Sequence, residues 1–215
     1  MISIDFHTHT FASKDSLTSP EKFVAAARNK KLDRVVVTDH NGIAGARAAY
    51  ALDPQRIIVG EEIMTTKGEI LAAFMTEEIP RGLSPRETIK RLRDQGAFIS
   101  VSHPFDSWRN GAWQLEDLLE ITPLVDAIEI FNARCTHAED NQKALEFALE
   151  HHLAGTAGSD AHAAFELGKA RLVLPEFTGP DELRKVILQG KVQGGLSPIW
   201  VHFASYYARW RKMVV

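Results

Sequence analysis

The sequence predicts an α/β fold, and two observations lead to this prediction. Short apolar segments rich in β-branched residues recur along the 215-residue chain. Longer segments with helical periodicity stand between most of them. Strands that alternate with helices in this way are typical of a parallel α/β architecture. Seven candidate strands suit either a small barrel or an open, doubly wound sheet, and periodicity alone does not choose between them.

The candidate strands are short, and all of them lie within the first 158 residues. Most are rich in Ile, Val and Phe, which fit a pleated surface that is buried on at least one face. We find no linker and no internal repeat between them. The predicted strands span residues 2–6, 34–38, 56–60, 69–75, 97–101, 126–131 and 153–158.

Two of the intervening helices have clear start signals. Ser19 is suited to cap the first helix, because Pro20 follows it at the first helical position. Ser84 and Glu87 have the spacing of a capping box. These signals predict helices over residues 19–30 and 84–95.

A third helix is predicted over residues 138–152. Leu145, Ala148 and Leu149 recur there at helical spacing.

The last part of the chain differs in character from the rest. Residues 178–190 are expected to form one more helix, and the segment after them is aromatic and ends basic. We therefore expect a main unit over residues 1–175 and a short C-terminal helical appendage over residues 176–215 that packs on it.

Phe203, Tyr207 and Trp210 stand at helical spacing in this appendage, beside several basic residues. Packing of these aromatic side chains against the main unit is the favoured interpretation. A surface on which nucleic-acid bases stack is the alternative.

Composition excludes several classes of protein. The formal net charge of −3 gives no overall attraction to nucleic acid or to an anionic membrane. The single cysteine, Cys135, excludes an internal disulfide framework and favours a reducing compartment. We see neither a signal-peptide pattern nor an apolar run long enough to span a bilayer. These features predict a cytoplasmic protein with no membrane association, and they indicate no obligate protein partner.

Ionisable residues alternate at the start of the chain. Asp5, His7 and His9 are spaced by two, so in a strand all three side chains would lie on one face. Such a face is poorly suited to a core, but it is well suited to metal binding.

Further residues of metal-ligand type follow other predicted strands. In α/β sheets and barrels, active sites form at the carboxyl ends of the strands. Residues from these positions would therefore meet at one mouth, where histidine and carboxylate ligands suit Zn, Mn or Fe better than Ca. The residues are Asp39 and His40, Glu61 and Glu62, His103, and Asp160 and His162.

Other catalytic motifs are missing from the sequence. It contains no phosphate-binding loop of the G-x-x-x-x-G-K-[ST] type, no H-E-x-x-H helix and no G-x-S-x-G nucleophile elbow. An ordinary thiol is the favoured interpretation of Cys135.

The motifs "DFHTHT", "TDHNG", "GEE", "SHPF" and "GSDAH", in this order, resemble those of the PHP (polymerase and histidinol phosphatase) domain family. The resemblance covers about residues 1–175 and implies a distorted seven-stranded (β/α) barrel with two or three divalent metal ions, usually Mn, Zn or Fe. The family includes histidinol phosphatases, phosphoesterases, nucleases and domains of bacterial DNA polymerases. The stretches "EIFN" and "SPIWVHF" resemble its small stand-alone phosphoesterases.

The resemblance also implies a set of metal ligands. Glu62 would bridge two metals, and we prefer it to Glu61 because Gly60 precedes it by two, as in the family pattern G-x-E. The implied ligands are His7, His9, Asp160 and Glu62 for the first metal, Glu62 and His103 for the second, and Asp15, His40 and His162 for the third.

One ligand of the family pattern is missing. Many members supply a further histidine after the sixth strand. Asn132, Cys135 and His137 are the candidates to replace it here, and none of them matches cleanly.

Other residues are expected to contact the substrate or orient a ligand. Arg134 is the candidate for phosphate binding during catalysis, because a guanidinium can bind phosphate with two hydrogen bonds. Arg109 and Asn132 are further candidates for substrate binding, and Trp108 could stack on a base. Asp39 is expected to orient a ligand histidine.

These expectations favour a metal-dependent phosphoesterase that uses a metal-bound hydroxide. Its partner would be a small phosphorylated substrate, such as a phosphomonoester, a nucleotide or a short oligonucleotide end. Two alternatives stay open: a metal-dependent hydrolase of a non-phosphate bond, and a non-catalytic PHP module.

Overall fold

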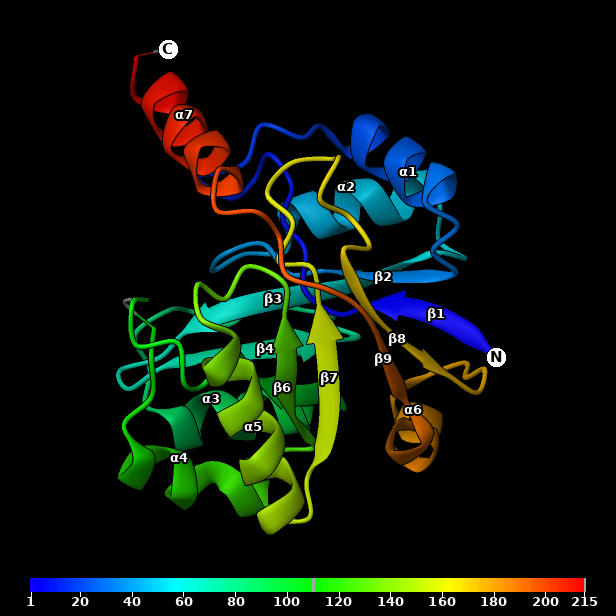
Figure 1. The fold of residues 1–215 in the computed structure, drawn as a ribbon. Helices are drawn as coiled ribbons and strands as arrows, with labels where there is room; N and C mark the ends of the chain where they lie inside the picture. The colour runs from blue at the N-terminus through cyan, green and yellow to red at the C-terminus, as the bar shows by residue number, and fades with distance from the viewer. Residues whose placement is uncertain (110, 215) are drawn as a thin grey trace.

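A mixed sheet curls around the buried core in the computed structural model of this chain, which describes residues 1–109 and 111–214 (Figure 1). The strand order is β7-β6-β5-β4-β3-β2-β1-β8-β9. The strands are β1 Ile2–Asp5, β2 Arg34–Val37, β3 Ile57–Met64, β4 Glu69–Ala73, β5 Phe98–Val101, β6 Ala127–Asn132, β7 Ala154–Gly158, β8 Ala170–Leu174 and β9 Lys191–Gly194.

Beyond its last residue, β1 is continued by a segment that pairs with the segment after β7, so the sheet nearly closes into a barrel. Thr8 and Ala161 form a parallel bridge, and the His9 amide donates to the Ala161 carbonyl at 2.8 Å. The Asp160 amide donates to the His7 carbonyl at 2.7 Å. This closure places residues that are far apart in the sequence side by side at one mouth.

The prediction of seven strands was too low. All seven candidates form strands, and within the described residues β8 and β9 bring the total to nine. The expectation of a parallel architecture holds for β1–β2–β3 and β5–β6–β7, whereas β4 is antiparallel to both neighbours and β8 is antiparallel to β1.

A tight turn explains the reversal of β4. The Thr65 amide and hydroxyl both donate to the Gly68 carbonyl, at 3.0 and 2.6 Å. A connection this short joins only antiparallel strands. Gly68 is required because a Cβ there would lie 2.3 Å from the Trp113 ring.

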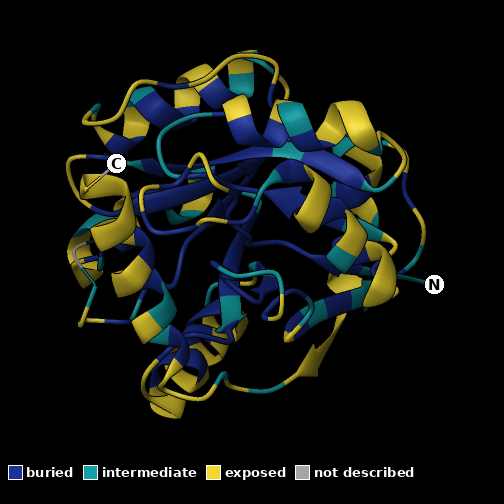
Figure 2. Ribbon diagram, turned by 90° about the horizontal axis from the view of Figure 1, so that it is seen from above, coloured by how far each residue is buried: buried dark blue, intermediate teal, exposed yellow. Residues whose placement is uncertain are grey.

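The helices cover the outside of the sheet, and buried residues gather on the strands (Figure 2). Ser19 accepts from the Lys22 amide and Ser84 from the Glu87 amide, which confirms both predicted N-caps. The helices are α1 Pro20–Asn29, α2 Ala44–Leu52, α3 Pro85–Asp94, α4 Leu115–Ile121, α5 Ala138–Glu150, α6 Pro180–Val186 and α7 Val201–Met213, with 3-10 turns at Thr122–Leu124 and Ile187–Gln189.

The predicted helix over residues 138–152 forms as α5, and its buried face includes only one of the three residues that indicated it. Ala148 is buried, but Leu145 and Leu149 are exposed. The face that packs on the sheet also contains Ala144 and Phe147, and the Phe147 ring contacts Phe105 edge-on with centroids 5.7 Å apart. The large aromatic ring of Phe147, rather than Leu145 or Leu149, therefore takes the buried position on this helix.

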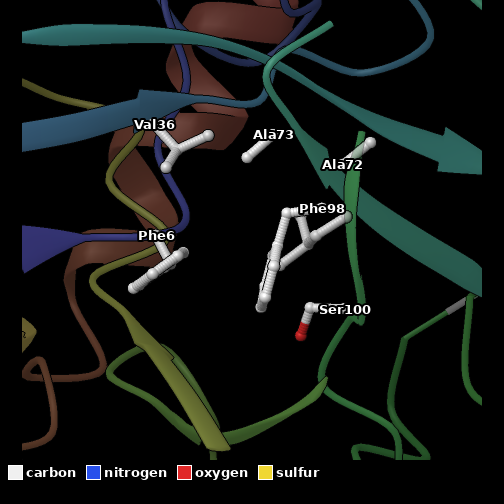
Figure 3. Close-up of a pocket in the computed structure, with 7 residues that line it drawn as sticks. Phe6, Val36, Ala72, Ala73, Phe98 and Ser100 are labelled. Atoms are coloured by element: carbon white, nitrogen blue, oxygen red, sulfur yellow. The ribbon is translucent and has the colours of Figure 1, made fainter. Parts of the chain in front are cut away.

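The interior of the barrel is packed. Phe6, Val36, Phe98 and Ser100 surround a residual cavity of about 10 Å³ (Figure 3). This volume is at the lower limit for a single water molecule. This cavity is too small for a substrate, so we expect the chemistry at the mouth.

The C-terminal segment is divided between the barrel and one outer helix. Leu183 and Ile187 pack with Ile4 and Phe98 in the core, and β9 pairs with β8. The predicted helix over residues 178–190 is α6 followed by a 3-10 turn. The division of the chain at residue 175 stays a prediction.

Helix α7 lies on the side of the molecule toward which β6 and β7 point (Figure 1). The predicted core packing of its aromatic residues was wrong: Phe203, Tyr207 and Trp210 are 71%, 56% and 53% exposed. Its buried residues are Val201, Ser205 and Ala208. Over the described parts of the chain, no helix has the length and apolar character needed to cross a bilayer.

Candidate metal centre

Four potential ligands meet where β1 and β7 approach each other. His7 Nε2 lies 3.1 Å from His9 Nε2 and 3.3 Å from Glu62 Oε1. Asp160 Oδ1 lies 3.6 Å from His7 Nε2 and 3.2 Å from His9 Nε2. Ligands about 2.1 Å from a tetrahedral metal lie about 3.4 Å from one another, so this spacing suits one metal ion.

The backbone around these residues is closely fitted. A Cβ at Gly158 would lie 2.3 Å from His7 Cβ, so only glycine lets the two segments approach this closely. Asp160 has a φ of 51°, which is unusual for a residue with a side chain. Its hydrogen bond to the His7 carbonyl holds this conformation and fixes the carboxylate beside the two histidines.

Asp5 does not join this group, although its spacing from His7 and His9 placed it on the same expected face. Its carboxylate accepts from the backbone amides of Ser159 at 2.8 Å and Gly168 at 2.9 Å. Burial raises the pKa of Asp5 to about 6, against the effect of these hydrogen bonds. β1 ends at Asp5, so simple alternation no longer applies beyond it.

A second group consists of Asp15, His40 and His162. Asp15 Oδ1 lies 3.6 Å from His40 Nε2 and 3.3 Å from His162 Nε2. The rings of His40 and His162 flank His9, with centroids 4.4 and 4.2 Å from it. The second group is therefore adjacent to the first.

Glu62 lies between the groups, whereas Glu61 points away from them. His40 Nδ1 lies 2.9 Å from Glu62 Oε2, and His103 Nε2 lies 3.1 Å from Glu62 Oε1. Glu61 instead accepts from the Ile79 amide at 2.9 Å, and burial raises its pKa to about 7. The structure therefore gives Glu62 the position from which one carboxylate can serve two metals.

A third group contains Glu69, which sequence reasoning missed. Glu69 Oε2 lies 3.4 Å from His103 Nε2, which also contacts Glu62. Because β4 runs antiparallel to its neighbours, its first residue lies at the mouth. In an all-parallel sheet only the carboxyl ends of strands carry such ligands, so Glu69 at the amino end of β4 was not expected. The short turn before Glu69 is the sequence signal for the reversal.

The three candidates after β6 do not fill the missing ligand position. Asn132 Nδ2 donates to Glu129 Oε2 at 3.1 Å and to Asp160 Oδ2 at 3.3 Å. His137 is exposed, and burial raises the pKa of the Cys135 thiol. Asn132 Oδ1 accepts from the Arg134 amide at 2.8 Å. Among the described residues, the groups of His, Cys, Asp and Glu side chains that could hold a metal include Glu69 but neither Cys135 nor His137.

The centre leaves buried oxygen atoms without hydrogen bonds. Asp15 Oδ1, Glu62 Oε2 and Asp160 Oδ1 accept none, although histidine nitrogens lie 2.9–3.6 Å away. Unpaired buried carboxylate oxygens are costly unless a cation compensates them. These residues therefore fit the divalent metals that the motifs imply.

The electrostatics of the centre depend on its close charge pairs. Burial opposes ionisation of Glu62, but His7 and His40 lower its pKa well below the usual range. Burial likewise opposes protonation of His40, yet Glu62 and Asp15 raise its pKa to about 9. Burial lowers the pKa of His9 to about 3, so this ring is neutral, the form that binds metals.

Further residues orient the two opening histidines. His7 Nδ1 lies 3.1 Å from Glu129 Oε1, and His9 Nδ1 lies 3.1 Å from Ser13 Oγ. Ser13 Oγ in turn donates to Asp39 Oδ1 at 2.6 Å. Asp39 therefore reaches His9 through Ser13, an arrangement by which proteins fix a ligand ring.

The two arginines expected to bind substrate differ in their surroundings. Arg109 Nη1 lies 2.6 Å from Asp160 Oδ2, and its Nε lies 3.0 Å from Asp106 Oδ2. Arg134 is buried, and its Nη2 donates to Ser205 Oγ at 2.9 Å and to the Val201 carbonyl at 3.3 Å. Arg134 is therefore not a surface residue, and its phosphate contact stays a prediction.

The sequence matches family models in two regions. A model described as a PHP domain matches residues 5–85, and one described as PHP-associated matches residues 138–192. A protein of Methanocaldococcus jannaschii, described as uncharacterized, is 37% identical over 187 residues, which cover 85% of this chain and 75% of that protein. The chain belongs to the PHP domain family.

Solved structures share the fold of this PHP protein. A two-domain Bacteroides vulgatus protein that contains a predicted PHP-like metal-dependent phosphoesterase superposes with a TM-score of 0.71 at 17% identity, over 96% of this chain and 69% of that chain. A lesion-specific endonuclease from Pyrococcus furiosus superposes with a TM-score of 0.61 at 17% identity, over 92% of this chain and 59% of that chain.

Proposed function

We propose that this PHP protein is a metal-dependent phosphoesterase that cleaves a phosphomonoester. The observation that supports this most is the arrangement of the three ligand groups. The first and third share Glu62, and the second contacts Glu62 through His40. Adjacent sites of this kind suit phosphoryl chemistry, in which several oxygens carry charge at once.

The eight ligands that the motifs imply, together with Glu69, would hold two or three divalent ions of the Mn, Zn or Fe type. Bound ions would supply positive charge that polarises a phosphoryl oxygen and lowers the pKa of water near neutrality. Glu129 and Ser13 would keep His7 and His9 in the orientation that binds metal. Arg109, which contacts Asp160, would add a cationic group beside the phosphate.

The substrate is proposed to be a nucleotide or the end of a short oligonucleotide. Trp108 is 78% exposed beside Arg109 and offers an aromatic face. Such a face stabilises a stacked base by about 1–3 kcal/mol. The net charge of −3 argues against a broad electrostatic footprint for long nucleic acid. The names of the two similar structures, a phosphoesterase and an endonuclease, agree with a phosphorylated substrate.

Two other functions predict different behaviour. A hydrolase of a non-phosphate bond, such as an amide, could use the same ligands. A non-catalytic module would gain nothing from buried carboxylate oxygens without partners. The divalent ions and Arg109, which would bind phosphate, favour the phosphoesterase.

The test is turnover by Mn-loaded protein on four substrate classes, each with a chelated control. The substrates are nucleoside monophosphates, nucleoside bisphosphates, short oligonucleotides and a base-free phosphomonoester. Chelator-sensitive release of phosphate, with the highest kcat/KM for a base-bearing substrate, is expected. Turnover of amides with no release of phosphate would contradict the proposal.

A further inference from the structure

Helix α7 contacts the metal centre through one polar face. Residues 201, 205, 209 and 212 lie on the same side of the helix. Ser205 accepts from Arg134, Arg209 contacts Asp15, and Lys212 donates to the carbonyls of Phe11 and Ser13. The docked face of α7 therefore contacts residues of the mouth, while its aromatic residues stay exposed.

The contact between Arg209 and Asp15 divides the roles of the two carboxylate oxygens. Arg209 Nη2 donates to Asp15 Oδ2 at 2.7 Å, and its Nε lies 3.3 Å from the same oxygen. Asp15 Oδ1 is buried without a hydrogen bond and faces His40 and His162. Arg209 on α7 thus holds Oδ2, and Oδ1 points at the histidines of the second ligand group.

Asp15 depends on such support because it lies in an irregular loop. Residues 10–18 contain turns over residues 11–15 and no helix or strand. Lys212 holds the same loop through the Ser13 carbonyl at 2.6 Å, and Ser13 contacts His9. Without Arg209, the Asp15 side chain would be free to rotate away from His40 and His162.

We propose that Arg209 is the positioning residue for the metal ion held by Asp15, His40 and His162, and that α7 docking is thereby coupled to occupancy of that site. The inference rests on the proposed function, because it takes Asp15 as a metal ligand. Partners that orient a ligand contribute about tenfold to a hundredfold to metal affinity. Coupling is reciprocal, so a metal ion that favours the held Asp15 also favours the docked helix.

The test is calorimetric titration of metal-free protein with Mn²⁺, compared between variants. The binding phase that His162→Ala removes is assigned to this site. Arg209→Gln is expected to weaken that phase about tenfold to a hundredfold and to leave the others unchanged. Arg209→Lys should restore part of the loss. Arg211→Gln is the matched control, because Arg211 is an exposed cation on the same helix.

Hydrogen exchange of residues 201–213 gives a second readout that does not need activity. Mn²⁺ should slow exchange in wild type and in Arg211→Gln, but much less in Arg209→Gln. In metal-free protein, Asp15→Ala should speed exchange of α7.

Three results would overturn the proposal. If Arg209→Gln binds Mn²⁺ like Arg211→Gln, Arg209 does not position the ligand, and the proposed function is unaffected. If exchange of α7 is the same with and without Mn²⁺, the coupling is absent. If His162→Ala shows every Mn²⁺-binding phase that the wild type shows, both this inference and the three-group metal centre fail.

Discussion

Glu69 Oε2 lies 3.4 Å from His103 Nε2, although the two residues come from strands that run in opposite directions. The antiparallel β4 begins where β5 ends, so both side chains reach the same mouth. Burial and the neighbouring Glu62 raise the pKa of Glu69. Glu62, Glu69 and His103 in this arrangement form a site that a cation would stabilise.

Glu69→Gln is therefore expected to have opposite effects on metal binding and on the metal-free protein. Affinity for the ion beside His103 should fall at least about tenfold. The metal-free variant should unfold at a higher denaturant concentration at neutral pH, because burial and Glu62 oppose ionisation of Glu69 and the amide cannot ionise. Metal titration and urea unfolding measure the two effects. Loss of stability with unchanged metal affinity would show that Glu69 is only structural.

Ser13→Ala is expected to weaken metal binding without contacting a metal. The variant removes the partner of His9 Nδ1 and a donor to Asp39. A loss of about tenfold to a hundredfold in metal affinity is expected for such a ligand-orienting residue. Ser3→Ala is the control, because Ser3 lies at the amino end of β1 and contacts Asp33 instead. Equal affinities of the two variants would contradict the role of the Ser13–Asp39 pair.

Glu61 makes a pH-dependent contribution to stability whose sign follows from its pKa. Burial raises this pKa from 4.5 to about 7. The folded state then binds more protons than the unfolded state, so the contribution is complete below about pH 4.5 and is lost as the pH rises through about 7.

Glu61→Gln resembles the neutral acid and should remove this dependence. Relative to wild type, the variant should gain up to about 3 kcal/mol in free energy of unfolding between about pH 5 and about pH 8. Urea unfolding of both metal-free proteins at the two pH values measures the difference. If the variant and the wild type differ in free energy of unfolding by the same amount at both pH values, Glu61 titrates near its ordinary pKa in the folded protein.

Trp108→Ala tests whether the substrate carries a base. Loss of a stacking contact of about 1–3 kcal/mol should raise KM for nucleotides about fivefold or more. KM for a base-free phosphomonoester should not change. Steady-state kinetics with both substrates gives the comparison, and equal effects on the two would remove the argument for a nucleotide.

The sequence predicted more of the strands than of their directions. All seven predicted strands form, because each is a short apolar run between turn signals. The reversal at β4 depends on a turn of a few residues around Gly68, which hydrophobic periodicity does not report. The pairing of β8 with β1 depends on contacts between segments far apart in the sequence, which no local pattern encodes.

The same limits explain which site residues sequence reasoning could reach. His7, His9, His40, Glu62, His103 and Asp160 follow or end strands that the pattern locates, and the structure brings them together. Predicting that Glu69 belongs to the site required knowledge of the direction of β4. Predicting the role of Arg209 required knowledge of the position of α7. The predicted packing of α7 was wrong because the spacing of its aromatic residues resembled that of a core helix.

The metal content of the purified protein tests the central claim most directly. Elemental analysis of wild type after loading with Mn²⁺ or Zn²⁺ and removal of free metal should find at least two ions per chain. Glu62→Gln should lose at least one of them, because Glu62 contacts ligands of both the first and the third group. Glu61→Gln should keep the wild-type content, since Glu61 points away. Fewer than one ion per chain in the loaded wild type, or equal losses in the two variants, would contradict the account.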